Sequence, residues 1–378
     1  MSVSKIWVGM DVHKESVMVS AFGEAGEEPI VEKRLANEGR KLRRFFDRLG
    51  REGGEIAACY EASGAGYVLH RALTEWGVHC DVVAPSLIPT RPGERRKHDR
   101  RDARHLARQY RAGELVTIRI PTEAEERVRD LVRCRETLQR EALKSKHYVL
   151  KFLRRRGLIY REGQNWTLKH FRWLRGLLRD GVLEGEDEEV FREYLALLEY
   201  KLARRDELDR RIEELALSPA YREAVGRLSS FRGISTHAAM VLVTELGDWR
   251  RFEHPGQLMA YVGLVPTEHS SGESRRLGSI TKAGNSHCRH VLVQAAWSYR
   301  HPPRVGSALK KRQEDQPPDV VAHSWKAQHR LHKVFRRLEY RKNSRIAVVA
   351  VARELVGFLW AVMQDLEAAR PRDVAEAA

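Results

Sequence analysis

The chain has few cysteines, no acidic surplus and no segment that we expect to cross a membrane. Its cysteines, Cys59, Cys80, Cys134 and Cys288, are scattered without paired spacing, which is typical of free thiols in a reducing cytoplasm. The opening stretch MSVSKIWVGMDVHKE reaches an aspartate too early for a signal peptide. No run approaches a spanning helix, and the apolar stretch RIAVVAVARELVGFLWAVM is predicted to be a core helix. We therefore expect a cytoplasmic protein with no membrane partner.

What the sequence has in excess is positive charge. Its 378 residues include 68 Lys and Arg against 52 Asp and Glu, a formal net charge of +16. Arginine is the commoner cation, and its planar guanidinium matches two phosphate oxygens at once. We therefore expect a polyanionic partner, most simply nucleic acid, and a protein associated with the nucleoid.

Three zones follow one another along the chain. Residues 1–120 alternate apolar runs and helical stretches: a strand pair in IWVGMDVHKESVMVSAFG, a helix in KLRRFFDRLG, a strand in EIAACYE, a helix in YVLHRALTEWG and a strand in HCDVVAP. Residues 121–217 contain two long charged helices, predicted to pack as an antiparallel coiled-coil hairpin. Such a hairpin serves either as a dimerisation arm or as a solvated spacer. Residues 218–378 are predicted to be mostly α-helical, so the fold class is α/β followed by α.

The stretch ERRKHDRRDARHLARQYRAG is predicted to be a helix with two chemically distinct faces. Ala103, Leu106 and Tyr110 form an apolar stripe, Asp99 projects from the same side, and Asp102 lies at its edge. The opposite face carries Arg100, Arg101, Arg104, Arg108 and Arg111. Taken alone, the two aspartates are explained by an N-cap and a first-turn acid. Inward-facing carboxylates are also what a metal site requires.

Two further acids in the first zone bear on that choice. Asp11 lies in the first predicted strand, on the same face as Gly9 and His13, and Glu61 ends the strand EIAACYE. Catalytic groups collect at strand ends in α/β folds. Four carboxylates converging on one point can hold two divalent ions for phosphoryl transfer, and hard oxygen ligands favour Mg²⁺ or Mn²⁺.

The segments WVGMDVHKE, YEASGAG and KHDRRDARHLA resemble the RuvC-like, RNase H-fold half of IS110-type insertion-sequence transposases, which include the IS1111 type. The resemblance implies that the family's Asp-Glu-Asp-Asp catalytic and metal-binding set falls on Asp11, Glu61, Asp99 and Asp102. It favours metal ligation over capping for the two helix aspartates. It also makes the face with Arg100, Arg101, Arg104 and Arg108 a predicted phosphate-binding surface.

The third zone carries a second candidate site. YVGLVPTEHSSGESRRLGSITKAGNSHCRHVLVQAAW resembles the family's C-terminal transposase domain, in which a serine attacks DNA and forms a phosphoserine. That role falls on Ser271, before Gly272, with Ser270 as the alternative; a plain polar turn is the structural alternative for both. The cations expected to balance the phosphate charge are Arg275, Arg276, Lys282 and Arg289.

The stretch SSFRGISTHAAMVLVTELGD, just before that domain, resembles a helix-hairpin-helix element that binds a phosphate backbone. Ser235 stands where a second glycine is usual. An ordinary helical hairpin in the core explains the same pattern.

The function predicted from these features is a site-specific DNA recombinase that moves an insertion sequence. The resemblance implies an element-encoded structured (bridge) RNA that pairs with donor and target DNA, and a homo-oligomer, a dimer or a dimer of dimers. Three alternatives differ in class: a Holliday-junction-type endonuclease that uses metal-activated water, a nonenzymatic nucleic-acid-binding protein, and an actin-like sugar kinase. The kinase would need glycine-rich nucleotide loops, which the sequence does not offer convincingly.

Overall fold

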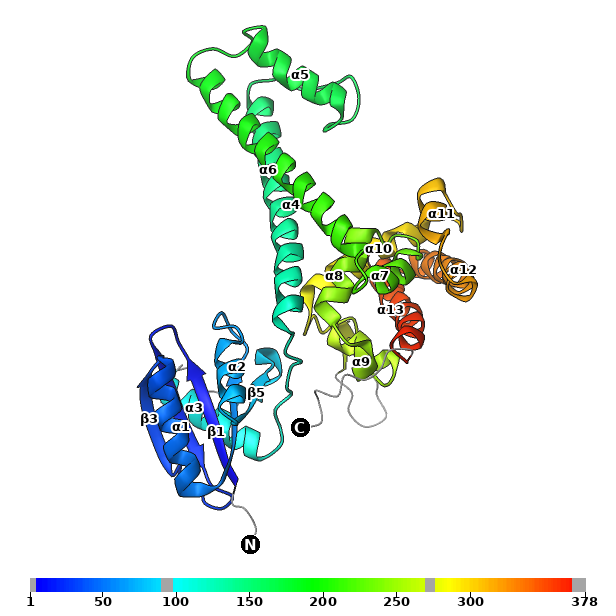
Figure 1. The fold of residues 1–378 in the computed structure, drawn as a ribbon. Helices are drawn as coiled ribbons and strands as arrows, with labels where there is room; N and C mark the ends of the chain where they lie inside the picture. The colour runs from blue at the N-terminus through cyan, green and yellow to red at the C-terminus, as the bar shows by residue number, and fades with distance from the viewer. Residues whose placement is uncertain (1–4, 90–97, 269–275, 369–378) are drawn as a thin grey trace. The chain divides into compact units, whose positions relative to one another are not determined.

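The computed structural model describes residues 5–89, 98–268 and 276–368. Contacts between Cα atoms divide the chain into two compact units, Met1–Pro121 and Thr122–Ala378. The first is a mixed α/β unit and the second is predominantly helical (Figure 1). The expected α/β-then-α order is therefore present.

A five-stranded mixed sheet forms the centre of the first unit. Its strands are β1 (Lys5–Val12), β2 (Ser16–Phe22), β3 (Val31–Ala36), β4 (Glu55–Glu61) and β5 (His79–Val83), in the order β3-β2-β1-β4-β5. β1 pairs antiparallel with β2 and parallel with β4, so it is the central strand. The predicted strand pair and both later strands are confirmed. β3 was not predicted, because VEKRLA carries three charged residues and is nowhere fully buried.

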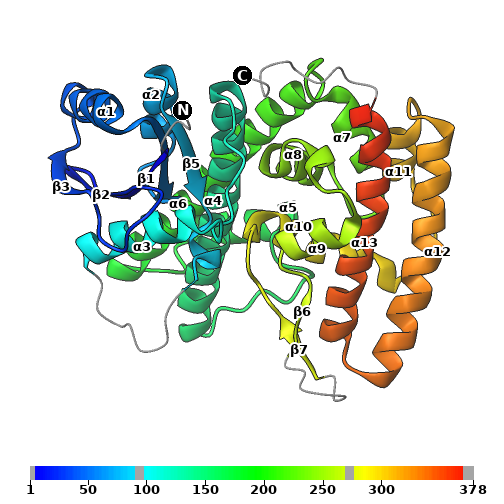
Figure 2. The same ribbon diagram turned by 90° about the horizontal axis from the view of Figure 1, so that it is seen from below.

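Helices cover both faces of this sheet. α1 (Gly39–Gly53) and α2 (Val68–Glu75) pack against Ile6, Val8 and Met10 on one face. α3 (Asp99–Arg111) covers the other face (Figure 2). There Leu106 and Tyr110 pack with Ala57 and Cys59 of β4. Strand side chains alternate between faces, so each residue of β1 and β4 can be assigned to the α1/α2 face or to the α3 face.

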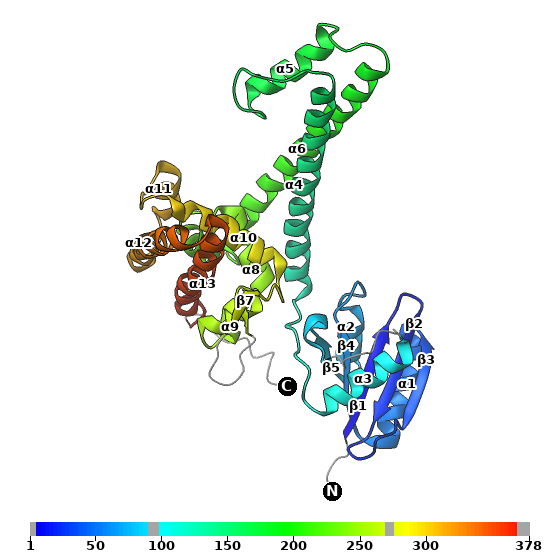
Figure 3. The same cartoon turned by 180° about the vertical axis from the view of Figure 1, so that it is seen from behind.

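The predicted pair of long helices is present in the second unit. α4 (Glu123–Arg155) and α6 (Glu186–Ala216) run side by side, and α5 (Leu168–Arg179) lies across their far end (Figure 3). Thr122 begins α4 with a capping box, accepting a hydrogen bond from the Glu125 amide while the Glu125 carboxylate bonds back. Arg135 donates two hydrogen bonds to Asp209, at 2.6 and 3.0 Å, and joins the two helices.

The C-terminal region is built around one apolar core. Its elements are α7 (Arg222–Ser229), α8 (Thr236–Leu246), α9 (Pro255–Tyr261), β6 (Pro266–Glu268), β7 (Leu277–Ile280), α10 (Ser286–Ala296), α11 (Ser307–Gln313), α12 (Pro318–Arg341) and α13 (Ser344–Ala368), with short 3-10 turns at Trp249–Arg251 and Trp297–Arg300. Val132 of α4 and Ile212 of α6 belong to the same core. The base of the helical hairpin and the C-terminal region therefore share one hydrophobic interior.

The expectation that no run approaches a spanning helix is wrong on length and composition. Ser344–Gln364 is 21 residues long and contains an 18-residue window with a mean hydropathy of 2.0, enough to cross a membrane by length and composition alone. Half of that window is buried inside the protein, where Leu355 and Leu359 are among the core residues. The helix is the core element expected from RIAVVAVARELVGFLWAVM, and its hydropathy follows from burial on the protein side.

Candidate active site

The site in the first unit depends on a glycine that lets α3 rest directly on the central strand. A Cβ at Gly9 would lie 2.2 Å from the Ala103 carbonyl oxygen and 2.4 Å from the Ala107 amide nitrogen. Both are backbone atoms, so no side-chain rotation could relieve the clash. Glycine at this position allows the close approach that brings the start of α3 to the C-terminal end of β1.

Two of the predicted acids meet there, together with a histidine. His13 Nε2 lies 3.2 Å from Asp11 Oδ2 and 3.6 Å from Asp99 Oδ1. One ligand atom from each of these three residues can be chosen so that all lie within 4.8 Å of one another. Asp11 lies near the end of β1, and His13 follows in the turn to β2, where its amide donates to the Ser16 carbonyl at 2.8 Å. The three side chains form a small, half-exposed group whose ligand atoms are close enough together to hold a cation.

Arg34 contributes the nearest positive charge. Its Nη2 donates to Asp99 Oδ2 at 2.5 Å, and its Nη1 donates to Ser16 Oγ at 3.2 Å. The hydrogen bond from Arg34 lowers the pKa of Asp99, and His13 adds to this effect. Asp99 is therefore ionised in the folded protein. Its second oxygen, Oδ1, faces His13.

The other two acids belong to the same side of the sheet. Glu61 ends β4, and alternation places it with Cys59 on the face that packs against α3. Asp102 lies one turn into α3, and one of its carboxylate oxygens is buried. Within the described residues, neither belongs to the tight group formed by Asp11, His13 and Asp99. The structure thus brings two of the four predicted carboxylates close together and places the other two on the same face.

The capping explanation for Asp99 is wrong. His98 is the N-cap of α3, Asp99 is the first helical residue, and no side chain caps the helix. The Asp99 carboxylate is instead directed to Arg34 and His13. His13 was missed as a site residue, although its position two residues after Asp11 on the same strand face was a usable signal.

The arginine face of α3 is largely engaged by the protein itself. Arg104 donates to both carboxylate oxygens of Glu32, at 2.8 and 3.1 Å, and Arg100 lies 3.3 Å from the same residue. Arg108 and Arg111 donate to backbone carbonyls between β2 and β3. These contacts exist because β3 and the loop before it lie under the helix. In the described part of the chain, exposed Arg101 has no such acidic partner.

The serine segment of the second unit is only partly described. Ser270, Ser271 and Arg275 fall in 269–275, outside the described residues. The strands that lead into and out of this segment pair antiparallel, with Pro266 opposite Ile280. The described strands on either side of it, β6 and β7, are thus hydrogen-bonded neighbours.

The predicted cations beside that hairpin differ in how free they are. Arg276 and Lys282 are exposed. Arg289 is half-buried and donates to the carbonyls of Val262 and Ala283, at 2.8 and 3.0 Å. Arg289 therefore holds the backbone near Val262 and Ala283, whereas the side chains of Arg276 and Lys282 are left exposed.

The glycine turn between α7 and α8 is packed into the core. Ile234 is fully buried, and a Cβ at Gly233 would lie 2.5 Å from the Ala295 carbonyl oxygen. Ser235 is the N-cap of α8, accepting from the Ala238 amide. This environment is that of a helical hairpin in the core, the second of the two explanations given above.

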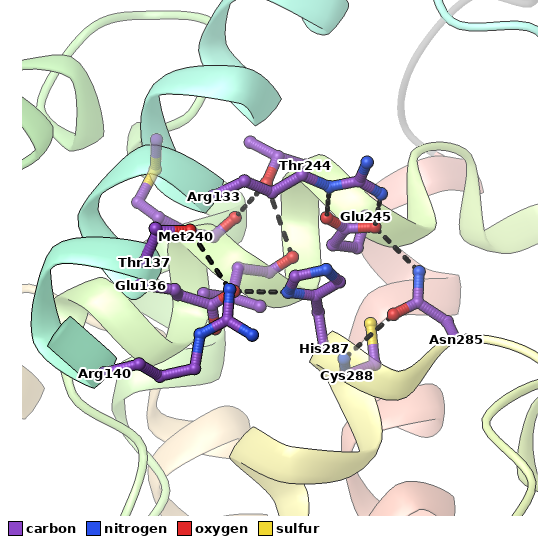
Figure 4. Close-up of polar contacts among 11 residues, drawn as sticks. Arg133, Glu136, Thr137, Arg140, Met240, Thr244, Glu245, Asn285, His287 and Cys288 are labelled. Carbon is purple, nitrogen blue, oxygen red and sulfur yellow. Dashed lines mark hydrogen bonds and ion pairs between the residues drawn. The ribbon is translucent and has the colours of Figure 1, made fainter. Parts of the chain in front are cut away.

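A polar network around the buried carboxylate of Glu245 connects α4 to α8 and to the start of α10 (Figure 4). Arg133 donates twice to Glu245, at 2.6 and 2.8 Å, and the Asn285 side chain donates to the same carboxylate at 2.7 Å. His287 forms a short contact with Glu136 of α4. Burial raises the pKa of Glu245, but the bonds from Arg133 and Asn285 outweigh it, so the pKa is lowered overall. The network fixes the start of α10 against the arm.

Two family models match separate parts of the chain. Residues 8–156 match the profile of a DEDD-type IS110 transposase, and residues 225–309 match the transposase IS116/IS110/IS902 family. A putative transposase of Sinorhizobium fredii is 38% identical over 362 residues, covering 95% of this chain and 88% of the relative. The transposase for insertion sequence element IS1533 of Leptospira borgpetersenii is 32% identical over 343 residues, covering 89% and 97%.

An acid-bearing α/β unit followed by a helical transposase region defines the chain as a DNA transposase. It belongs to the IS110 family of insertion-sequence transposases. This assignment decides against the sugar kinase and the nonenzymatic binding protein.

Proposed function

We propose that the first unit is an RNase H-like (RuvC-like) domain in which Asp11, Glu61, Asp99 and Asp102 hold Mg²⁺ or Mn²⁺. The observation that carries this proposal is the convergence of Asp11, His13 and Asp99 within 4.8 Å. Two carboxylates and an imidazole are a donor set that divalent cations accept, and the imidazole favours Mn²⁺ more than Mg²⁺. The chemistry of the residues present therefore fits the ion.

Asp99 and His13 would have different roles at this site. Asp99 is kept ionised by Arg34, so it is available as a ligand without first losing a proton. The Nε2 atom of His13 lies close to both aspartate carboxylates, and without a proton this nitrogen would be a third ligand for the ion. A divalent ion bound there would act as a Lewis acid toward a phosphate oxygen.

We further propose that Ser271, with Ser270 as the alternative, is the nucleophile for DNA strand cleavage. Its Oγ would form a bond to phosphorus while one bridging P–O bond breaks, and the serine proton would pass to a base or to the leaving oxygen. The exposed cations Arg276 and Lys282 support this assignment because both belong to the same segment of chain. Rejoining would reverse the step with a second DNA end.

The proposed partners are donor and target DNA, an element-encoded structured (bridge) RNA and further copies of the chain. The net charge of +16 supports a nucleic-acid partner and does not distinguish DNA from RNA. The arm formed by α4 and α6 is the proposed means of assembling a dimer or a dimer of dimers.

The decisive experiment is a search for a covalent protein–DNA adduct. Protein co-expressed with the noncoding flanks of its element is incubated with Mg²⁺ and nicked donor or target DNA, and the products are separated on a denaturing gel. We expect an adduct that is lost in Ser271→Ala, kept in Ser270→Ala, and lost in Asp11→Asn although DNA binding persists. Loss in Ser270→Ala alone would move the nucleophile by one residue. Cleavage without an adduct in all variants would identify a water-using endonuclease instead. Sequencing the RNA that copurifies tests the guide.

A further inference from the structure

The exposed side of α12 in the C-terminal region carries two adjoining hollows that none of the predicted sites explains. The first, of about 590 Å³, is lined by Pro303, Lys326, His329, Arg330, His332 and Lys333. The second, of about 250 Å³, is lined by Val305, Gln313, Val321, Trp325 and Gln328. Both are lined by residues of α12, and they meet where the ring of Trp325, which lines the second, contacts the ring of His329, which lines the first.

The larger hollow is strongly basic. Lys326, His329, Arg330 and Lys333 are all exposed, and they recur on one side of the helix at intervals of three and four residues. Arg330 is paired with Glu354 at 2.5 Å. Within the described residues, neither lysine has a carboxylate partner within ion-pair distance. Unpaired cations along a groove are the electrostatic footprint of a phosphate backbone.

The smaller hollow has an aromatic wall and an unsatisfied buried amide. Trp325 is 43% exposed, and its ring meets that of His329 edge to face at 4.6 Å. Gln328 is 1% exposed, and its Oε1 accepts from the Arg304 amide at 3.0 Å and from Arg232. These donors fix the orientation of the amide, and its Nε2 finds no acceptor within the described part of the chain. A buried amide donor without an acceptor is costly unless a ligand supplies one.

The size and chemistry of the smaller hollow suit a nucleobase. Its volume is below the roughly 300 Å³ at which pockets for drug-sized ligands begin. A base has a flat face to stack on Trp325 and a ring carbonyl to accept from Gln328 Nε2. A base inside a duplex could not offer its face and edge in this way, so the strand must be unpaired.

We propose that the α12 face binds an unpaired DNA strand, with phosphates on Lys326 and Lys333 and one base between Trp325 and Gln328. DNA is favoured because strand cleavage and transfer by a transposase expose unpaired DNA. The inference rests on the DNA transposase activity and is independent of the serine and metal assignments proposed above.

The first test is binding of the purified full-length chain to a fluorescent single-stranded oligonucleotide of about 12 nucleotides. Loss of base stacking in Trp325→Ala should weaken binding roughly 5- to 100-fold. Tyr340→Ala is the matched control, because Tyr340 is a 93% exposed aromatic residue on the same helix, outside both hollows. Replacing Lys326 and Lys333 together by alanine should lower the slope of log K against log salt by about 1.4.

The second test locates the base directly. An oligonucleotide with 5-iodouracil is irradiated with the wild-type protein, and the adduct is mapped by mass spectrometry. We expect an adduct on the peptide that contains Trp325, and we expect Gln328→Leu to reduce it. Unchanged affinity in Trp325→Ala, or no adduct on that peptide, would overturn the proposal. Equal dependence on Trp325 for duplex DNA would refute the unpaired strand, and tighter binding of the matching RNA would refute DNA as the ligand. None of these outcomes depends on cleavage, so they are separable from failure of the serine mechanism.

Discussion

Replacing Gly9 by alanine should damage stability and DNA cleavage together. The added Cβ would stand 2.2 Å from the Ala103 carbonyl oxygen, and contacts below 3.0 Å are essentially never seen for real Cβ atoms. α3 must therefore move away from β1 by at least about 0.8 Å, the difference between these two distances. Overpacking of this kind costs about 1–3 kcal/mol, and we expect the upper end because the obstructing atoms are backbone.

The same displacement moves Asp99 relative to Asp11. Misplacement of a catalytic group by about 1 Å lowers rates on the order of 100-fold, which is the loss of cleavage expected for Gly9→Ala. Hydrogen exchange followed by mass spectrometry on the β1 and α3 peptides gives the local stability, and a gel assay gives the cleavage rate. An opening free energy smaller by about 3 kcal/mol corresponds to exchange roughly 100-fold faster.

The control for this experiment is Gly39→Ala at the start of α1. A Cβ there meets nothing within 4 Å, and the backbone conformation is ordinary. We expect stability equal to the wild type or higher by a few tenths of a kcal/mol to about 1 kcal/mol. If Gly9→Ala exchanged and cleaved like the wild type, the direct packing of α3 on β1 would be refuted.

Two other predictions follow from burial and charge. Burial and the nearby Arg135 lower the pKa of His237 to about 4, below its ordinary 6.5. The unfolded chain therefore binds this proton at a higher pH than the folded chain, and the free energy of unfolding falls as the pH drops from 6.5 to about 4. His237→Asn should remove up to about 3 kcal/mol of that fall, measured as denaturant midpoints at both pH values. If the variant kept the pH dependence of the wild type, the assignment to His237 would be wrong. Arg101→Ala should lower the slope of log K against log salt for duplex DNA binding by about 0.9. Arg104→Ala should remove the hydrogen bonds to Glu32 and leave that slope unchanged. A wild-type slope in Arg101→Ala would mean that Arg101 does not contact phosphate, and a lowered slope in Arg104→Ala would mean that Arg104 does.

The secondary structure of the first unit was largely predictable, and the reason lies in its burial pattern. The strand EIAACYE was predicted with its correct bounds, because its five central residues are buried and form one apolar run in the sequence. β3 was missed because an edge strand with intermediate and exposed side chains carries no such run. That omission changed the interpretation of the arginine face of α3, since Glu32 of β3 is the partner of Arg104.

Two of the four predicted acids, Asp11 and Asp99, lie close together in the structure, and their surroundings could not be predicted. Asp11 and Asp99 stand out by motif, whereas the pairing of Asp99 with Arg34 spans 65 residues and depends on the position of β3 in the sheet. The role of Gly9 was equally hidden, because a single glycine in a strand says nothing about which backbone approaches it. Gln328 shows the same limit on α12, since only the fold reveals that its amide is buried.

The shared core of the arm and the C-terminal region makes α4 a lever. Val132 is anchored in that core, and from there to Arg155 the helix rises roughly 35 Å at about 1.5 Å per residue. A rotation of about 10° at the anchor would sweep the far end through roughly 6 Å. The contacts between Arg133 and Glu245 and between Glu136 and His287 lie next to Val132, at the anchored end of the helix. A movement of the far end of α4 would therefore reach the first turn of α10, because His287 of that turn contacts Glu136 of α4.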